Sequence, residues 1–167
     1  MTTAYLGLGG NIGDPVHAMA EALRALDADP ATRVAAVSPV YRTPPWGPVE
    51  QPPFLNACAC VETSLEAEEL LALCLSVEAS LHRDRSVRWG PRTVDLDLLD
   101  FGGRSLASDR LTLPHPRMAD RAFVLVPLAD IAPQLSVEGV SVIEHLRSLD
   151  TSGIERRDLA ADWWRTA

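Results

Sequence analysis

Hydrophobic positions in the first part of the chain recur with two different periods. Apolar residues run continuously or alternate over residues 4–9, 33–43 and 54–62, which is typical of β-strands. Between the first two runs, Met19, Leu23 and Leu26 recur at helical spacing. Asp14 followed by Pro15 is a typical start for such a helix. We therefore expect a strand, a helix that ends near residue 28, and two further strands.

The second part of the chain continues this alternation of periods. Thr63 and Ser64 are expected to cap a helix over residues 66–82, and a strand follows near residues 94–99. Gly102 and Gly103 indicate a hairpin turn, residues 111–113 a short strand, and residues 119–131 and 142–149 two closing helices. The resulting order β-α-β-β-α-β is that of the ferredoxin-like motif, in which helices pack on one face of an antiparallel sheet.

We therefore predict an α+β fold, a ferredoxin-like sandwich with an antiparallel sheet and added C-terminal helices. With 167 residues, of which 47% are hydrophobic, the chain is expected to form one domain over residues 1–167. Its core is expected to span about residues 3–147, followed by a tail from about residue 150. The adjacent Trp163 and Trp164 in that tail are expected to anchor it onto the domain.

The strand near residues 94–99 carries the most specific chemistry. Its alternation places Asp95 and Asp97 on one face, and Val94, Leu96 and Leu98 on the other. Carboxylates two residues apart on a strand are separated by roughly 6.5 Å at the backbone. They can converge on two divalent cations about 3.5–4 Å apart, the spacing of two-metal phosphoryl-transfer sites. The alternative is a pair of solvated carboxylates on an exposed strand.

Charge is distributed unevenly around this strand. The net charge is −8, all 15 basic residues are arginines, and eight of these lie within residues 83–121. Without lysine, the chain has no P-loop lysine and no Schiff-base lysine. The acidic remainder argues against nucleic acid as a partner. Clustered arginine forks next to carboxylates instead favour a small polyanion such as a nucleoside triphosphate held with Mg²⁺.

Four other side chains are candidates for ligand contacts. His115, which lies between two prolines, can reach phosphate or serve structure alone. Phe54 and Phe123 can stack on a ring or belong to the core. Asn56 shares a strand face with Phe54, so its amide can contact a heteroaromatic ligand or make a cross-strand hydrogen bond.

Two further observations concern the cellular setting. Three cysteines, Cys58, Cys60 and Cys74, form no CxxC pair and are expected to be small buried residues rather than disulfide or zinc ligands. No apolar run reaches the length needed to span a bilayer, and the N-terminus has no basic leader. We expect a cytoplasmic monomer without a membrane partner.

Taken together, these residues closely resemble the 6-hydroxymethyl-7,8-dihydropterin pyrophosphokinase family of folate biosynthesis. The resemblance runs in order from about residue 3 to about residue 147. It rests on residues 5–11, 40–47, 54–57, 83–85, 88–99, 113–116, 121–125, 127–128 and 131–133. It implies a ferredoxin-like αβα sandwich that transfers pyrophosphate from ATP to the hydroxymethyl group of the pterin and releases AMP.

The resemblance also implies a role for each matching residue. Asp95 and Asp97 match ligands of two Mg²⁺ ions, and Arg83 and Arg92 match arginines that clamp the triphosphate. These four are the expected catalytic residues. The expected ATP contacts are Arg83, Arg85, Arg88, Trp89, Arg92, Leu98, Arg110, Thr112, His115 and Arg121. The expected pterin contacts are Thr43, Pro45, Trp46, Gly47, Phe54, Asn56, Asp95 and Phe123, with Phe54 and Phe123 on either side of the ring.

Three positions depart from the family pattern. Gly10 stands where Ser is common, Leu75 where Gln is common, and His82 where Gly is common. Leu75 removes a potential polar contact to ATP, and His82 is expected to stiffen the start of the arginine-rich loop. None of them removes a metal ligand or a clamp arginine.

Two alternatives remain open at this point. One is another Mg²⁺-dependent enzyme with a D-x-D site, a nucleotidyltransferase or glycosyltransferase. The other is a ferredoxin-like binding module without catalytic activity.

Overall fold

The protein is described by a computed structural model that covers residues 1–45, 48, 50–83 and 94–166. Six strands form one antiparallel sheet: β1 (Thr2–Gly10), β2 (Thr32–Val37), β3 (Tyr41–Thr43), β4 (Phe54–Thr63), β5 (Asp95–Phe101) and β10 (Glu155–Arg156). The strand order is β10-β3-β4-β1-β5, and β2 pairs with the far half of β4. The predicted α+β class with an antiparallel sheet is therefore confirmed.

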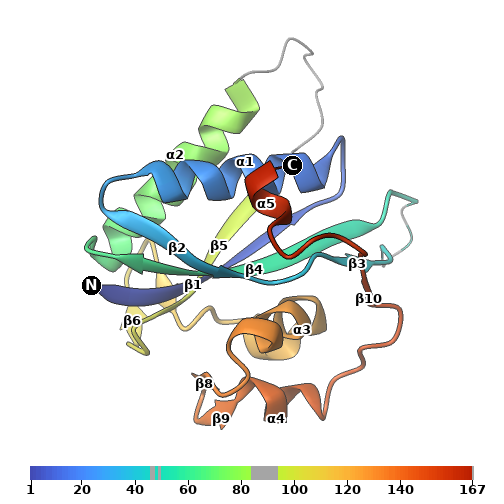
Figure 1. The fold of residues 1–167 in the computed structure, drawn as a ribbon. Helices are drawn as coiled ribbons and strands as arrows, with labels where there is room; N and C mark the ends of the chain where they lie inside the picture. The colour runs from blue at the N-terminus through green and yellow to red at the C-terminus, as the bar shows by residue number, and fades with distance from the viewer. Residues whose placement is uncertain (46–47, 49, 84–93, 167) are drawn as a thin grey trace.

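Helices cover both faces of this sheet (Figure 1). One face carries α1 (Pro15–Ala28) and α2 (Ala67–Arg83), and the other carries α3 (Ala122–Ile131) and α4 (Val142–Leu146). The remaining short elements are β6 (Leu106–Ala107), β7 (Thr112–Leu113), the 3₁₀ turn η1 (Met118–Asp120), β8 (Ser136–Val137), β9 (Val140–Ser141) and α5 (Trp163–Thr166). The predicted order β-α-β-β-α-β placed helices on one face of the sheet only. The C-terminal helices α3 and α4 cover the other face.

Each face of the sheet has its own hydrophobic core. Leu6, Leu8, Leu96 and Leu98 are buried in the cluster that contains residues of α1 and α2. Leu99 belongs to the second cluster, which includes residues of α3. The alternation predicted for residues 94–98 is thus confirmed for the apolar positions, because Val94, Leu96 and Leu98 all face the α1 and α2 side.

The start of α1 follows the predicted pattern. Asp14 Oδ1 accepts a hydrogen bond from the backbone N–H of His17 at 3.1 Å, and Pro15 is the first helical residue. The cap predicted for the second helix was wrong. The carboxylate of Glu69 accepts the N–H of Glu66 at 2.9 Å, whereas Thr63 Oγ1 accepts from Leu65 before the helix starts.

The strand predicted over residues 33–43 is two strands, β2 and β3. Ser38 interrupts it: its N–H donates to Cys58 O, and its Oγ accepts from Cys58 N, both at 2.9 Å. Pro39 follows and has no N–H with which to continue the ladder. The predicted hairpin at Gly102 and Gly103 was also wrong in part, because the turn forms but β6 pairs with β7 rather than with β5.

The C-terminal tail is anchored as expected. Trp163 and Trp164 are 4% and 5% exposed and belong to the core beside α1. Trp163 Nε1 donates to Ser38 O at 3.0 Å, and Arg24 donates to Trp164 O at 2.8 Å. The three cysteines are buried as predicted. Among the described residues, no helix is both long and apolar enough to cross a membrane.

Candidate functional site

Two glycines on the central strand β1 create a hollow on the α3 face of the sheet. Residues that lie directly opposite each other in paired strands share a face. Gly7 lies between Cys58 on β4 and Asp97 on β5, and Gly9 lies between Asn56 and Asp95. Because neither glycine has a side chain, the surface of the sheet is open between the side chains on β4 and those on β5.

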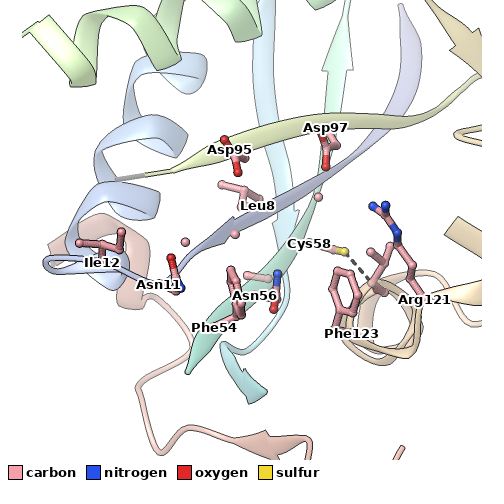
Figure 2. A pocket seen from close by; sticks show the side chains of 15 residues that line it. Leu8, Asn11, Ile12, Phe54, Asn56, Cys58, Asp95, Asp97, Arg121 and Phe123 are labelled. Carbon is pink, nitrogen blue, oxygen red and sulfur yellow. Dashed lines mark hydrogen bonds between the residues drawn. The ribbon is translucent and has the colours of Figure 1, made fainter. Parts of the chain in front are cut away.

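A cavity of about 450 Å³ occupies this hollow. Figure 2 shows Asp95 and Asp97 pointing into it from β5, Phe54 and Asn56 from β4, and Phe123 from the start of α3. Its rim includes the turn after β1, with Asn11 and the exposed Ile12. Cys58 lies on the floor, where its thiol donates to Val124 O at 3.5 Å.

A smaller cavity of about 180 Å³ adjoins it, between Phe54 and Phe123. Two polar atoms in its lining, Thr43 Oγ1 and Asn56 Oδ1, are buried and have no hydrogen-bond partner among the described residues. A buried polar atom without a partner costs about 1–3 kcal/mol. Aromatic rings next to unsatisfied polar atoms suit a flat ligand whose edge carries hydrogen-bonding groups.

A second cavity of about 480 Å³ lies beyond β5, between α2 and the β6–β7 loop. Its polar side chains include Arg110, Thr112 and His115, and its apolar wall includes Leu75. Asp95 and Asp97 line this cavity as well as the first one. The two carboxylates therefore form a wall that is shared by two cavities, each of them large enough for a ligand.

The electrostatics of the shared wall favour a cation. Burial raises the pKa of Asp97, and the nearby charge of Asp95 raises it further, whereas His115 and Arg121 lower it. Two carboxylates at this position repel each other, so a bound divalent cation would relieve that repulsion. Asp95 and Asp97 provide the hard oxygen ligands that Mg²⁺ prefers.

His115 is held in one orientation. Its backbone N–H donates to Leu99 O at 2.9 Å, and its Nδ1 accepts the N–H of Arg117 at 3.3 Å. Burial lowers the pKa of His115, and the charges of Arg121 and Arg117 act in the same direction, whereas Asp97 opposes them. The neutral ring therefore carries its proton on Nε2, which leaves an N–H donor for an anionic ligand.

Arg121 connects the two ligand spaces electrostatically. It is the N-cap residue of α3, and its guanidinium lies over the ring of Phe123, 5.6 Å from the centroid. It lines the first cavity, and its charge acts on both Asp97 and His115. An arginine in this position can hold a negative charge between a ring site and the carboxylates.

Comparison with known proteins now identifies the family. The model of 7,8-dihydro-6-hydroxymethylpterin-pyrophosphokinase (HPPK) matches residues 5–133. This chain belongs to the HPPK family.

Curated HPPK relatives cover nearly the whole chain. A protein of Methylorubrum extorquens named 2-amino-4-hydroxy-6-hydroxymethyldihydropteridine pyrophosphokinase is 53% identical over 93% of this chain and 99% of its own length. A protein of the same name from Pseudomonas aeruginosa is 44% identical over 91% of this chain and 94% of its own length.

Solved structures support the fold. A Plasmodium falciparum HPPK-DHPS structure superposes with a TM-score of 0.71 at 14% identity, covering 87% of this chain and 43% of that chain. The wild-type structure with pteroate gives a TM-score of 0.70 at 13% identity, covering 88% and 42%. This chain spans less than half the length of those proteins, and at such identity the likeness concerns the fold alone.

Most of the described residues that the HPPK resemblance singled out come together at the two cavities. The first cavity and its small neighbour collect Thr43, Phe54, Asn56, Asp95, Asp97, Arg121 and Phe123. The second collects Asp95, Asp97, Leu98, Arg110, Thr112 and His115. Leu98 has its side chain in the α2-side core and is 3% exposed.

Other predicted residues are not placed at the site by the described coordinates. Pro45 is described but lines none of the three cavities. Outside the described residues lie Trp46, Gly47, Arg85, Arg88, Trp89, Arg92 and the side chain of Arg83.

The sequence analysis did not single out several residues that border the candidate site. Gly7 and Gly9 form the cavity floor, and their spacing of two within a strand was an available signal. Asn11 Nδ2 donates to Gln51 Oε1 at 3.1 Å across the cavity rim. Glu78 accepts the N–H of Leu96 at 2.5 Å, and nothing in the pattern of α2 distinguishes it from a solvated acid.

Proposed function

We propose that this chain transfers the terminal pyrophosphoryl group of ATP to the hydroxymethyl oxygen of 6-hydroxymethyl-7,8-dihydropterin and releases AMP. The reaction belongs to folate biosynthesis. Membership of the HPPK family supports the proposal. The single observation that carries it is the position of Asp95 and Asp97, which line both cavities and so lie where two substrates would meet.

The pterin is assigned to the first cavity and its small neighbour. Thr43 Oγ1 and Asn56 Oδ1 there are buried and need partners, which the amide and amine edge of a pterin can supply. Phe54 and Phe123 would enclose the ring. The proposed pterin contacts are Thr43, Pro45, Trp46, Gly47, Phe54, Asn56, Asp95 and Phe123.

ATP is assigned to the second cavity. Neutral His115 donates Nε2–H, and arginine forks provide directional donors for the triphosphate. The proposed ATP contacts are Arg83, Arg85, Arg88, Trp89, Arg92, Leu98, Arg110, Thr112, His115 and Arg121. Within this set, Arg83 and Arg92 are proposed to clamp the phosphates during transfer.

Two Mg²⁺ ions are proposed to bind at Asp95 and Asp97. Among the described residues, no group of three or more His, Cys, Asp or Glu side chains could hold a metal. The two carboxylates therefore need further ligands from phosphate and water, which is how Mg²⁺ usually binds. When bound, Mg²⁺ neutralises phosphate charge and makes the phosphorus more electrophilic.

The residues of the chain itself are proposed to orient the two substrates. With the pterin in the first cavity and ATP in the second, the hydroxymethyl group and the phosphates would lie on opposite sides of one pair of carboxylates. Holding both reactants in this way can supply a large part of the rate enhancement, because the entropy of bringing them together is lost on binding. Arg121 lies beside Phe123 and can stabilise charge that develops near the pterin oxygen.

The finer description of the fold is also a proposal. The pairing order β2-β4-β1-β5, with α1 and α2 on one face, is consistent with a ferredoxin-like core. In that description β3, β10 and the C-terminal helices are additions to it. A monomer with a single domain in the cytoplasm remains our expectation.

The test is incubation with ATP, Mg²⁺ and the reduced pterin alcohol, followed by mass analysis of the products. AMP and the pterin diphosphate are expected in equal amounts. ADP would indicate a simple kinase, and free pyrophosphate a nucleotidyltransferase. If no product forms and a Mg²⁺–ATP analogue does not alter pterin affinity, the chain is a binding module instead.

A further inference from the structure

The C-terminal segment, residues 150–166, contacts the chain stretch 38–44 at several successive points. Strand β10 pairs with β3, Glu155 opposite Arg42 and Arg156 opposite Tyr41. The backbone N–H of Arg157 donates to Val40 O at 2.8 Å. Figure 1 shows β10 alongside β3 at the edge of the sheet.

Further contacts hold the segment at both ends of this strand pairing. At one end, Trp163 Nε1 donates to Ser38 O at 3.0 Å, and the indole is 4% exposed in the core. At the other end, Gly153 lies against Pro44, so close that a Cβ on this glycine would be 3.2 Å from Pro44 Cγ.

Strand β3 depends on this support. It contains only three residues, between Pro39 and Pro44, and neither proline can donate a backbone hydrogen bond. On its other side β3 pairs with β4 over the same three residues. Without β10, the strand would be a short exposed edge, which is a weakly held element.

Strand β3 ends at Thr43, a residue that lines the small cavity. Its hydroxyl is buried, has no partner among the described residues, and lines the small cavity beside Asn56. A displacement of Pro44 would move the adjacent Thr43, whereas the carboxylates on β5 lie on the far side of β4 and β1.

We infer that the C-terminal segment is a positioning element for the pterin cavity: it sets the place of Thr43 through β3 and Pro44. This inference rests on the proposed function, because it assigns the cavity to the pterin. It predicts that a change in the segment alters pterin binding and leaves ATP binding unchanged.

Two glycines of the chain make a matched pair for the test. Gly153 and Gly139 both have φ of +81°, a backbone conformation that strains any side chain placed there. A Cβ at Gly153 meets Pro44, whereas a Cβ at Gly139, in the turn between β8 and β9, meets nothing within 4 Å. Gly153→Val and Gly139→Val therefore share the backbone cost and differ in the contact with Pro44.

The measurements are kcat, KM for each substrate, pterin affinity with a bound Mg²⁺–ATP analogue, and melting temperature. Both variants are expected to melt somewhat below the wild type. Gly153→Val is expected to raise KM and Kd for the pterin about two- to tenfold, the worth of one hydrogen bond, at unchanged KM for ATP. Gly139→Val is expected to keep both KM values.

A second variant acts at the other end of the segment. Trp163→Phe keeps an aromatic ring in the core but removes the donor to Ser38 O, and a smaller increase in pterin KM is expected. If Gly153→Val and Trp163→Phe keep the wild-type pterin KM, if Gly139→Val raises it as much as Gly153→Val, or if both KM values change in parallel with melting temperature, the segment is only structural and the inference is wrong. A wild type that forms no AMP would instead reject the proposed function, and this inference with it.

Discussion

The two faces of strand β1 show how one short sequence serves two purposes. On one face, Leu6 and Leu8 are 0% and 2% exposed and fill the core under α1 and α2. On the other face, Gly7 and Gly9 have no side chains and form the floor of the first cavity. The alternation of a strand allows a close-packed core and a hollow site to lie only one residue apart.

The largest expected effect is on the hollow face. Asp97→Ala removes a carboxylate that lines both cavities, and we expect a loss of about 10²–10³ in turnover or more, roughly 3–4 kcal/mol. The fold should survive, because Asp97 lines the cavities and belongs to neither hydrophobic core. AMP release measured beside circular dichroism checks this, and near-normal activity in the folded variant would contradict it.

The opposite result is expected on the filled face. Leu6→Ala should lower the free energy of unfolding by about 3 kcal/mol, because it leaves a void in the core. KM for both substrates should change little in the fraction that remains folded. Urea unfolding and steady-state kinetics at low temperature measure the two quantities, and a rise in KM without loss of stability would show that the faces are not separate.

The two glycines of the hollow face can be compared directly. A Cβ at Gly9 would be 2.6 Å from Asn56 Nδ2, whereas a Cβ at Gly7 meets only side-chain carbons of Leu99, at 3.6 Å or more. Gly9→Ala must displace the Asn56 amide, so pterin affinity should fall by about tenfold, the value of one or two hydrogen bonds.

Gly7→Ala is the matched comparison and should cost clearly less pterin affinity. Titration of the pterin in the presence of a Mg²⁺–ATP analogue measures both variants. Equal losses would mean that the amide of Asn56 is not the contact that matters.

The smallest expected effect is on the pH dependence of stability without metal or ligand. The pKa of Asp97 is raised above 3.8 in the folded protein, chiefly by burial, so the folded state binds this proton more tightly than the unfolded state. The stabilisation from protonated Asp97 is present below about pH 3.8 and is lost as pH rises through the folded-state pKa. Asp97→Asn should lack this loss and gain stability relative to the wild type between acid and neutral pH. Urea unfolding of both proteins at acid and at neutral pH tests this prediction. A difference in unfolding free energy between the two proteins that does not change with pH would rule it out.

Much of the fold followed from local pattern. The Asp14-Pro15 start of α1 and the strand alternation at residues 94–98 both depend on neighbours in sequence. The predictions that failed depend on distant partners. Ser38 breaks a strand because Cys58 takes its hydrogen bonds, and β6 pairs with the more distant β7 rather than with β5.

The candidate site divides in the same way. The spacing of Asp95 and Asp97 predicted a shared face, which is confirmed, and a metal site, which stays a prediction. The spacing of Gly7 and Gly9 was a local signal for a hollow, but the partners of Gly9 and Glu78 were not predictable. Gly9 lies against Asn56 on another strand, and Glu78 accepts the N–H of Leu96 on another element. An acid on a helix has no distinctive local signal.

By itself, the sequence determined which side chains are available for phosphate, metal and ring binding, and on which face of its own strand or helix each one lies. Only the tertiary structure decided that Thr43 and Asn56 line one cavity, that the C-terminal tail lies along β3, and that two cavities share one wall of carboxylates. The physical reason is range. Faces follow from the local geometry of the backbone, whereas pairing register and the hollows between elements arise from contacts between residues that are far apart in the chain.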